Sequence, residues 1–161
     1  MLYIVAWPLL NEADDRTLRQ MRAQYHPGEA EMIGPHFTLV FGAAVSSETR
    51  LREALPAFAD RRAFWFVLDR IERSGRYLYA VPSDGHEELV ALHDAFDSDP
   101  GGEPFEPHIT LGLFDTPAAA EQVARIVERQ RLPLYGRVEE LSLLRRQNET
   151  LDTLASVRLL A

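Results

Sequence analysis

One short motif occurs twice in the sequence. Pro-His-Phe-Thr-Leu spans residues 35–39, and Pro-His-Ile-Thr-Leu spans residues 107–111. The segments before the motifs also correspond, because tyrosine, alanine and proline occupy matching places in residues 2–8 and 76–82. A chain with this repeat is expected to have two related halves. Each half should start with a strand, pass through a helix and reach a strand that carries histidine.

Four helices are predicted from apolar residues that recur at helical spacing. Their expected starts carry residues that commonly cap helices, namely Asn11, Ser46 or Ser47, Ser83, and Thr116 followed by Pro117. The apolar faces of the helices consist of Leu18, Met21 and Tyr25; Leu51, Leu55 and Phe58; Leu89, Leu92 and Phe96; and Val123, Ile126 and Val127. Pro56 should kink or end the second helix because proline lacks a backbone N–H.

Apolar runs outside these helices predict further strands. Residues 64–71 should form a buried strand, and residues 134–144 and 151–160 should form two strands joined by a turn at residues 147–149. Residues 97–106 are expected to be a loop that leads into the second motif.

This order of elements predicts an α+β fold. We expect a duplicated, bilobal, pseudo-twofold arrangement in which two small, mostly antiparallel sheets line a central cleft and the helices lie outside. Residues 1–161 should form one domain, with lobes of about residues 1–72 and 73–161.

The composition excludes several kinds of chemistry. The chain has no cysteine, so it has no disulfide, thiolate zinc site or cysteine nucleophile. All 17 basic residues are arginine, which excludes a P-loop lysine, a Schiff base and a lysine that carries AMP. The net charge of −8, without a dense basic run, argues against long duplex nucleic acid as a partner. A small nucleotide needs only a local positive site and is compatible with this charge.

The start of the chain does not resemble a targeting segment. Residues 1–10 are apolar but lack a basic region before them and are interrupted by Pro8, so they predict a strand. No apolar stretch approaches the length that spans a membrane. We therefore expect a cytoplasmic protein with no membrane partner.

The two motifs are expected to lie on strands, where side chains alternate between faces. The first motif should place Phe37, Leu39 and Phe41 on the core face, and His36, Thr38 and Val40 on the opposite face. The second should place Ile109, Leu111 and Leu113 on the core face, and His108 and Thr110 on the opposite face. Two imidazoles can supply the base and the acid that phosphodiester cleavage requires near neutral pH. The threonine hydroxyls can donate hydrogen bonds to phosphate oxygens.

With these motifs and the continuation Leu-Val-Phe-Gly at residues 39–42, nearly the whole chain resembles the 2H phosphoesterase superfamily. This group includes bacterial 2′-5′ RNA ligase-like proteins and cyclic nucleotide phosphodiesterases. The resemblance implies the bilobal α+β fold, catalysis without metal or cofactor, and action on 2′,3′-cyclic phosphates or 2′-5′ linkages. It assigns catalytic roles to His36, Thr38, His108 and Thr110. Small nucleotides or RNA ends are the expected substrates, and a monomer is expected.

The sequence departs from the family pattern after the second motif. Many relatives carry a basic residue there, whereas this chain has Leu-Phe at residues 113–114. Phosphate charge must then be met elsewhere, and Arg76, Arg145 and Arg146 are candidates. Candidates for stacking on a base are Tyr3, Tyr77 and Tyr79. The remaining histidines, His26, His86 and His93, are expected at the surface or at element boundaries.

Two other functions are compatible with the repeated motif. The protein could be a non-catalytic module that binds a nucleotide or a phosphorylated metabolite. It could also be a metal hydrolase that uses the histidines as ligands, although neither motif carries a carboxylate at the usual ligand spacing. Joining of RNA ends is the reverse of the expected reaction and would use the same groups.

Overall fold

The computed structural model describes residues 1–96 and 104–161, and most of the loop expected at residues 97–106 lies outside them. The strands are β1 (Leu2–Leu10), β2 (Phe37–Ala43), β3 (Phe64–Ser74), β4 (Tyr77–Pro82), β5 (Ile109–Leu113), β6 (Leu134–Gln147) and β7 (Thr150–Arg158). The α-helices are α1 (Glu12–Tyr25), α2 (Pro27–Met32), α3 (Glu48–Ala54), α4 (His86–Phe96) and α5 (Pro117–Gln130). Two 3₁₀ segments are η1 (Val45–Ser47) and η2 (Leu55–Asp60).

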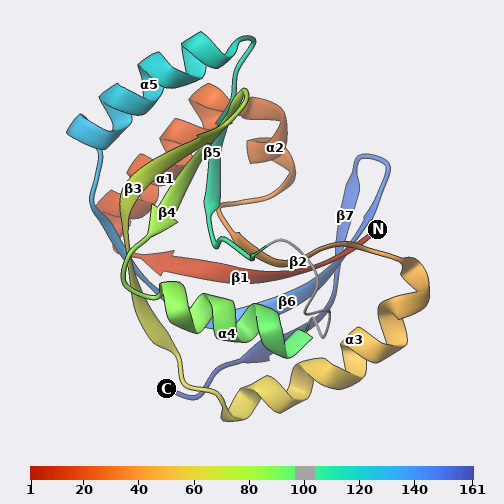
Figure 1. The fold of residues 1–161 in the computed structure, drawn as a ribbon. Helices are drawn as coiled ribbons and strands as arrows, with labels where there is room; N and C mark the ends of the chain where they lie inside the picture. Colours follow the sequence, from red (N-terminus) through yellow and green to blue (C-terminus); the bar gives the residue numbers. More distant parts are fainter. Residues whose placement is uncertain (97–103) are drawn as a thin grey trace.

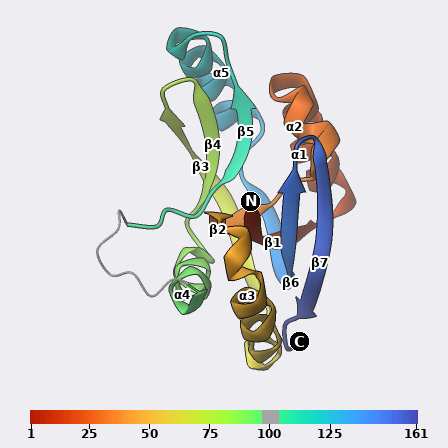
Figure 2. The same cartoon turned by 90° about the vertical axis from the view of Figure 1, so that its right-hand side faces the viewer.

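Within the described ranges the strands form one seven-stranded sheet. Its order is β2-β1-β6-β3-β4-β5, β7 pairs with β6, and every pairing between these strands is antiparallel. The predicted α+β class is confirmed. The two expected sheets are parts of one continuous sheet, because β3 pairs with β6. Strands β3, β4 and β5 lie on the opposite side of the molecule from the β6–β7 hairpin (Figures 1 and 2).

Strand pairing repeats between the two parts of the chain. Val5 pairs with Thr38 on β1 and β2, and Tyr79 pairs with Thr110 on β4 and β5. The helices cross between the parts, since α1 packs against β5 and α4 packs against β2. This correspondence supports the proposal that residues 1–72 and 73–161 are related lobes.

Each motif strand contains a β-bulge directly after its threonine. The register shifts between the pairs Ile4↔Val40 and Val5↔Thr38, and an equivalent shift occurs on β5. A bulge inserts an extra residue and breaks the alternation of side chains. The prediction that Phe41 joins the core is therefore wrong, because its side chain is 80% exposed. Val40, expected on the polar face, packs against the core instead.

Two of the four predicted helix caps are confirmed, and Ser47 precedes α3 without a side-chain capping bond. The Asn11 side chain accepts a hydrogen bond from the Asp14 N–H at 2.8 Å, and Thr116 caps α5 in the same way. Helix α3 ends at Ala54, and a 3₁₀ segment with Pro56 in its first turn follows. Helix α4 starts at His86 rather than at Ser83, whose hydroxyl donates to Asp69.

Two burial predictions need correction. Ile126 is 44% exposed, because α5 instead buries the stripe Ala120, Ala124 and Val127, and the small alanines were not recognised as a packing face. Strand β3 is not buried on both faces, since Trp65 is 65% exposed while its neighbour Phe66 is buried. It therefore has the alternation of a sheet with one solvated face.

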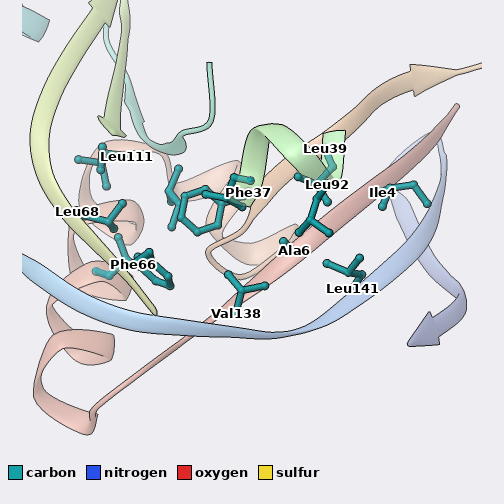
Figure 3. Close-up of a cluster of buried hydrophobic side chains, with 14 of the residues drawn as sticks. Ile4, Ala6, Phe37, Leu39, Phe66, Leu68, Leu92, Leu111, Val138 and Leu141 are labelled. Atoms are coloured by element: carbon teal, nitrogen blue, oxygen red, sulfur yellow. The ribbon is translucent and has the colours of Figure 1, made fainter. Parts of the chain in front are cut away.

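The main hydrophobic core joins both parts of the chain (Figure 3). Phe37 from β2 and Phe66 from β3 meet edge to face, with ring centroids 5.2 Å apart. Leu111 of the second motif and Leu39 of the first belong to the same cluster. The buried faces of the two motif strands are thus fixed by one core, which places their opposite faces relative to each other. No helix in the described ranges has both the length and the apolar content needed to cross a membrane.

Candidate active site

The two motif histidines are anchored in the same way. The Nδ1–H of His36 donates to the carbonyl of Gly34 at 2.8 Å, and the Nδ1–H of His108 donates to the carbonyl of Glu106 at 2.9 Å. A carbonyl only accepts, so each neutral ring carries its proton on Nδ1 and leaves Nε2 unprotonated. Both motifs therefore leave the same ring nitrogen, Nε2, unprotonated in the neutral form.

The surroundings of His36 disfavour the protonated form of its ring. Burial lowers its pKa from the ordinary 6.5, the hydrogen bond to Gly34 opposes that shift, and the charge of Arg22 adds to it. Smaller effects come from Glu29, which raises the pKa, and from His108, which lowers it. The neutral form of His36 is favoured near neutral pH.

The lowered pKa of His36 predicts a pH-dependent stability. Between the folded-state pKa and the unfolded value of 6.5, the unfolded chain binds more protons, so the free energy of unfolding should fall as pH falls through this range. Urea unfolding from about pH 8 to about pH 5 tests this, since histidine titrates in that range. His36→Asn should reduce the slope, and part should persist because burial also lowers the pKa of His26. An unchanged slope in the variant would contradict the assignment.

A cavity opens beside the first motif. It is lined by Tyr3, Val5, Glu29, Met32, Ile33, His36, Thr38, Phe41, Leu144, Arg146 and Leu151. The rings of Tyr3 and Phe41 meet edge to face at its wall, with centroids 5.4 Å apart. A second hollow, on the side of α4, shares Thr38 and Phe41 with it. The cavity combines apolar walls with one cation, Arg146, and one carboxylate, Glu29.

The second motif has an aromatic neighbourhood of its own. The ring of Tyr79 lies 4.2 Å from that of His108, and Tyr77 stacks on Tyr79 with centroids 6.0 Å apart. His86 contacts the Glu106 carboxylate at 3.1 Å, and the carbonyl of Glu106 anchors His108. His86 is thus at an element boundary, as expected, since it is the first residue of α4, and its ring contacts the segment before the motif.

Some of the candidate substrate-binding residues lie beside the cavity or the second motif, whereas Arg145 and Arg76 do not. Tyr3 and Arg146 line the cavity, and Tyr77 lies in the aromatic row that ends at His108. Arg145 does not line the cavity and faces Glu48 at 3.9 Å. Arg76 is exposed near the β3–β4 turn, away from both hollows, and its carbonyl accepts from the Phe114 N–H.

Three residues of the site region were not predicted from the sequence. Phe41 lies outside the core because of the bulge in β2, and a bulge leaves no clear signal in the sequence. Glu29 lies on the short helix α2, which was not predicted. Arg22 is buried in α1. The sequence indicates this position, because Arg22 follows Leu18 by four residues and so falls on the apolar face of that helix. In residues 1–96 and 104–161, no three His, Cys, Asp or Glu side chains are grouped so as to hold a metal ion.

The fold has clear relatives among solved structures. Escherichia coli LigT complexed with NADP+ matches at a TM-score of 0.65 and 21% identity, over 98% of this chain and 96% of that one. LigT complexed with 3′-AMP matches at a TM-score of 0.65 and 20% identity, over 98% and 97% of the two chains. TT0787 of Thermus thermophilus matches at a TM-score of 0.63 and 19% identity, over 98% and 96%. The architecture is thus that of the LigT-like α+β proteins.

The family follows from the sequence model. The model of the 2′-5′ RNA ligase superfamily matches residues 10–150, and the chain belongs to that superfamily. This confirms the predicted membership of the 2H phosphoesterase superfamily. A search of curated proteins finds no match.

Proposed function

We propose that this protein is a metal-independent hydrolase that cleaves 2′,3′-cyclic phosphate or 2′-5′ phosphodiester bonds in nucleotides or at RNA ends. His36 and His108 would act as its acid/base pair. The observation that carries the proposal is their shared anchoring, in which a backbone carbonyl two residues earlier holds each Nδ1–H. Each Nε2 is then the nitrogen that exchanges a proton with substrate.

The role of base is assigned to His36, because its lowered pKa favours the neutral form that a base needs. Its Nε2 takes the proton of the attacking water while the water oxygen bonds to phosphorus. The bond from phosphorus to a ribose oxygen breaks, and that oxygen takes the proton from Nε2 of a protonated His108. Exchange with solvent then restores both rings. Thr38 and Thr110 would donate to the non-bridging phosphate oxygens.

The cavity would hold the part of the substrate beside the base. In a 2′-5′ linked substrate the neighbouring 3′-hydroxyl would first replace water as the attacking group. Its oxygen bonds to phosphorus, the bond to the 5′-oxygen of the leaving nucleoside breaks and that oxygen takes the proton, which leaves a 2′,3′-cyclic phosphate for water to open. The nucleoside that carries the 3′-hydroxyl would lie against Tyr3 and Phe41. The leaving side would lie along Tyr77 and Tyr79. Small nucleotides as ligands are supported by the LigT structures with NADP+ and 3′-AMP. A monomeric state and a cytoplasmic location stay predictions.

A substrate panel tests the function. We expect turnover of 2′,3′-cyclic mononucleotides or 2′-5′ linked dinucleotides, little turnover of 3′-5′ linked controls, and no effect of EDTA. Activity that EDTA removes and a divalent cation restores would indicate a metal hydrolase. Tight binding of the same compounds in calorimetry, without turnover, would indicate a binding module.

A further inference from the structure

Arg22 is a buried charge with no direct counter-ion among the described residues. Its side chain on α1 is 2% exposed, and one terminal nitrogen, Nη2, has no hydrogen-bond partner in the described parts of the chain. Burial lowers the pKa of its guanidinium, yet arginine stays charged in proteins. Burying such a charge is costly unless it is well compensated. A residue kept under these conditions requires an explanation beyond packing.

The hydrogen bonds of Arg22 reach the second histidine motif and the loop directly before the first. Its Nε–H donates to the carbonyl of Thr110 at 3.1 Å, within the second motif. Its Nη1–H donates to the carbonyl of Ile33 at 2.9 Å. Ile33 precedes Gly34, whose carbonyl anchors His36. One rigid guanidinium thus links the backbone of β5 to the loop that holds the first imidazole.

The surroundings of Arg22 keep α1 and β5 in close contact. A Cβ built on Gly112 would lie 2.7 Å from the Cβ of Tyr25, so glycine is needed where the strand passes the helix. A similar contact supports the first motif, since the Nδ1–H of His93 on α4 donates to the carbonyl of Leu39 at 2.7 Å. Each motif strand is therefore held by a side chain from a helix of the other part of the chain.

Several charged or titratable groups face His36. Arg22 comes from α1, Glu29 from α2, and His108 from the segment before β5. Arg146 on β6 and Tyr3 on β1 line the same cavity as His36. Among these groups the charge of Arg22 opposes protonation of His36, and Glu29 favours it.

We propose that Arg22 is a positioning residue, which fixes the distance between the two histidine motifs by holding the carbonyls of Thr110 and Ile33 at the same time. This inference rests on the proposed two-histidine reaction. Arg22 does not line the substrate cavity, so it acts through the motifs and not by contact with substrate. Because the charge of Arg22 also lowers the pKa of His36, its removal gives the positioning role a readout that a purely structural role would not move.

Two variants separate the geometric role from the electrostatic one. Arg22→Gln removes the charge and the pair of N–H donors that hold the two carbonyls, so kcat should fall about 10- to 100-fold with little change in KM. The acid limb of its pH–rate profile should move to higher pH, because the pKa of His36 rises when the repelling charge is gone. Arg22→Lys keeps the charge but cannot hold both carbonyls, so kcat should fall while the acid limb stays in place. Arg16→Met, at an exposed site on α1, is the matched control and should change neither.

The outcomes are decisive even if one variant does not fold. Wild-type kcat in a folded Arg22→Lys would overturn the positioning role, and an unmoved acid limb in a folded Arg22→Gln would overturn the electrostatic one. Titration of His36 by NMR in wild type and Arg22→Gln needs no substrate. A shift of that titration to higher pH, in a protein that cleaves none of the panel, would refute the proposed function and leave the Arg22–His36 coupling standing.

Discussion

Replacing either His36 or His108 with alanine is expected to lower the turnover of a 2′,3′-cyclic nucleotide by about 10²- to 10⁴-fold. Each substitution removes the group that takes or gives one of the two protons in the proposed reaction. The loss should appear in kcat, because the proton transfers occur in the transition state. Initial rates with a cyclic mononucleotide, measured at equal protein concentration, give the comparison.

Folding must be separated from catalysis in these variants. Both imidazoles are held by one hydrogen bond to a backbone carbonyl, so their removal should leave the circular dichroism spectrum unchanged. His26→Ala is a suitable control, since that ring is a histidine outside both motifs. A folded His36→Ala or His108→Ala that retains near wild-type turnover would refute the acid/base mechanism. The double variant should lose little more than the worse single one if the two rings act together.

Phe37→Ala is expected to lower the free energy of unfolding by about 3–5 kcal/mol. The ring is fully buried, meets Phe66 edge to face, and belongs to the residue between His36 and Thr38 in the chain. Stability of a domain is only about 5–15 kcal/mol, so the variant should be close to unfolding at room temperature. Urea unfolding followed by fluorescence measures the loss.

Phe41→Ala is the matched control on the same strand. Because that ring is largely exposed, its loss should change the free energy of unfolding by less than about 0.5 kcal/mol. It should instead raise KM for 2′-5′ linked dinucleotides, where a stacked base is worth about 1–3 kcal/mol. Equal destabilisation by the two substitutions would contradict the placement of these rings.

Features decided by nearby residues could be predicted from the sequence. Asn11 and Thr116 cap their helices because each side chain needs only the N–H three residues ahead. Alternation on β2 could be predicted through Leu39, because the core selects every second side chain up to the bulge. The repeated motif gave the polar residues that the two strands present, although their catalytic roles stay a proposal.

Features decided by distant parts of the chain could not be predicted. The position of Phe41 depends on how β2 pairs with β1 beyond Thr38. The cavity needs Leu151 from β7 and Glu29 from α2, which no local pattern brings together. After the second motif, Phe114 packs against Tyr25 with ring centroids 5.5 Å apart, so this place serves packing instead of holding the basic residue that the family resemblance predicts. A buried cation reaches that motif from α1 instead, because the Arg22 Nε–H donates to the carbonyl of Thr110.

The order of the strands has a consequence for how such a chain can arise. β3 pairs with β4 across the middle of the sequence, and β6 returns from the end of the chain to pair with β1. In the proposed division into lobes, each lobe contributes a strand that pairs with a strand of the other, as happens when two subunits exchange an element. A protein half as long, with one motif, would gain the same pair of imidazoles by self-association. Fusion of two such copies would then leave the two histidine motifs free to diverge.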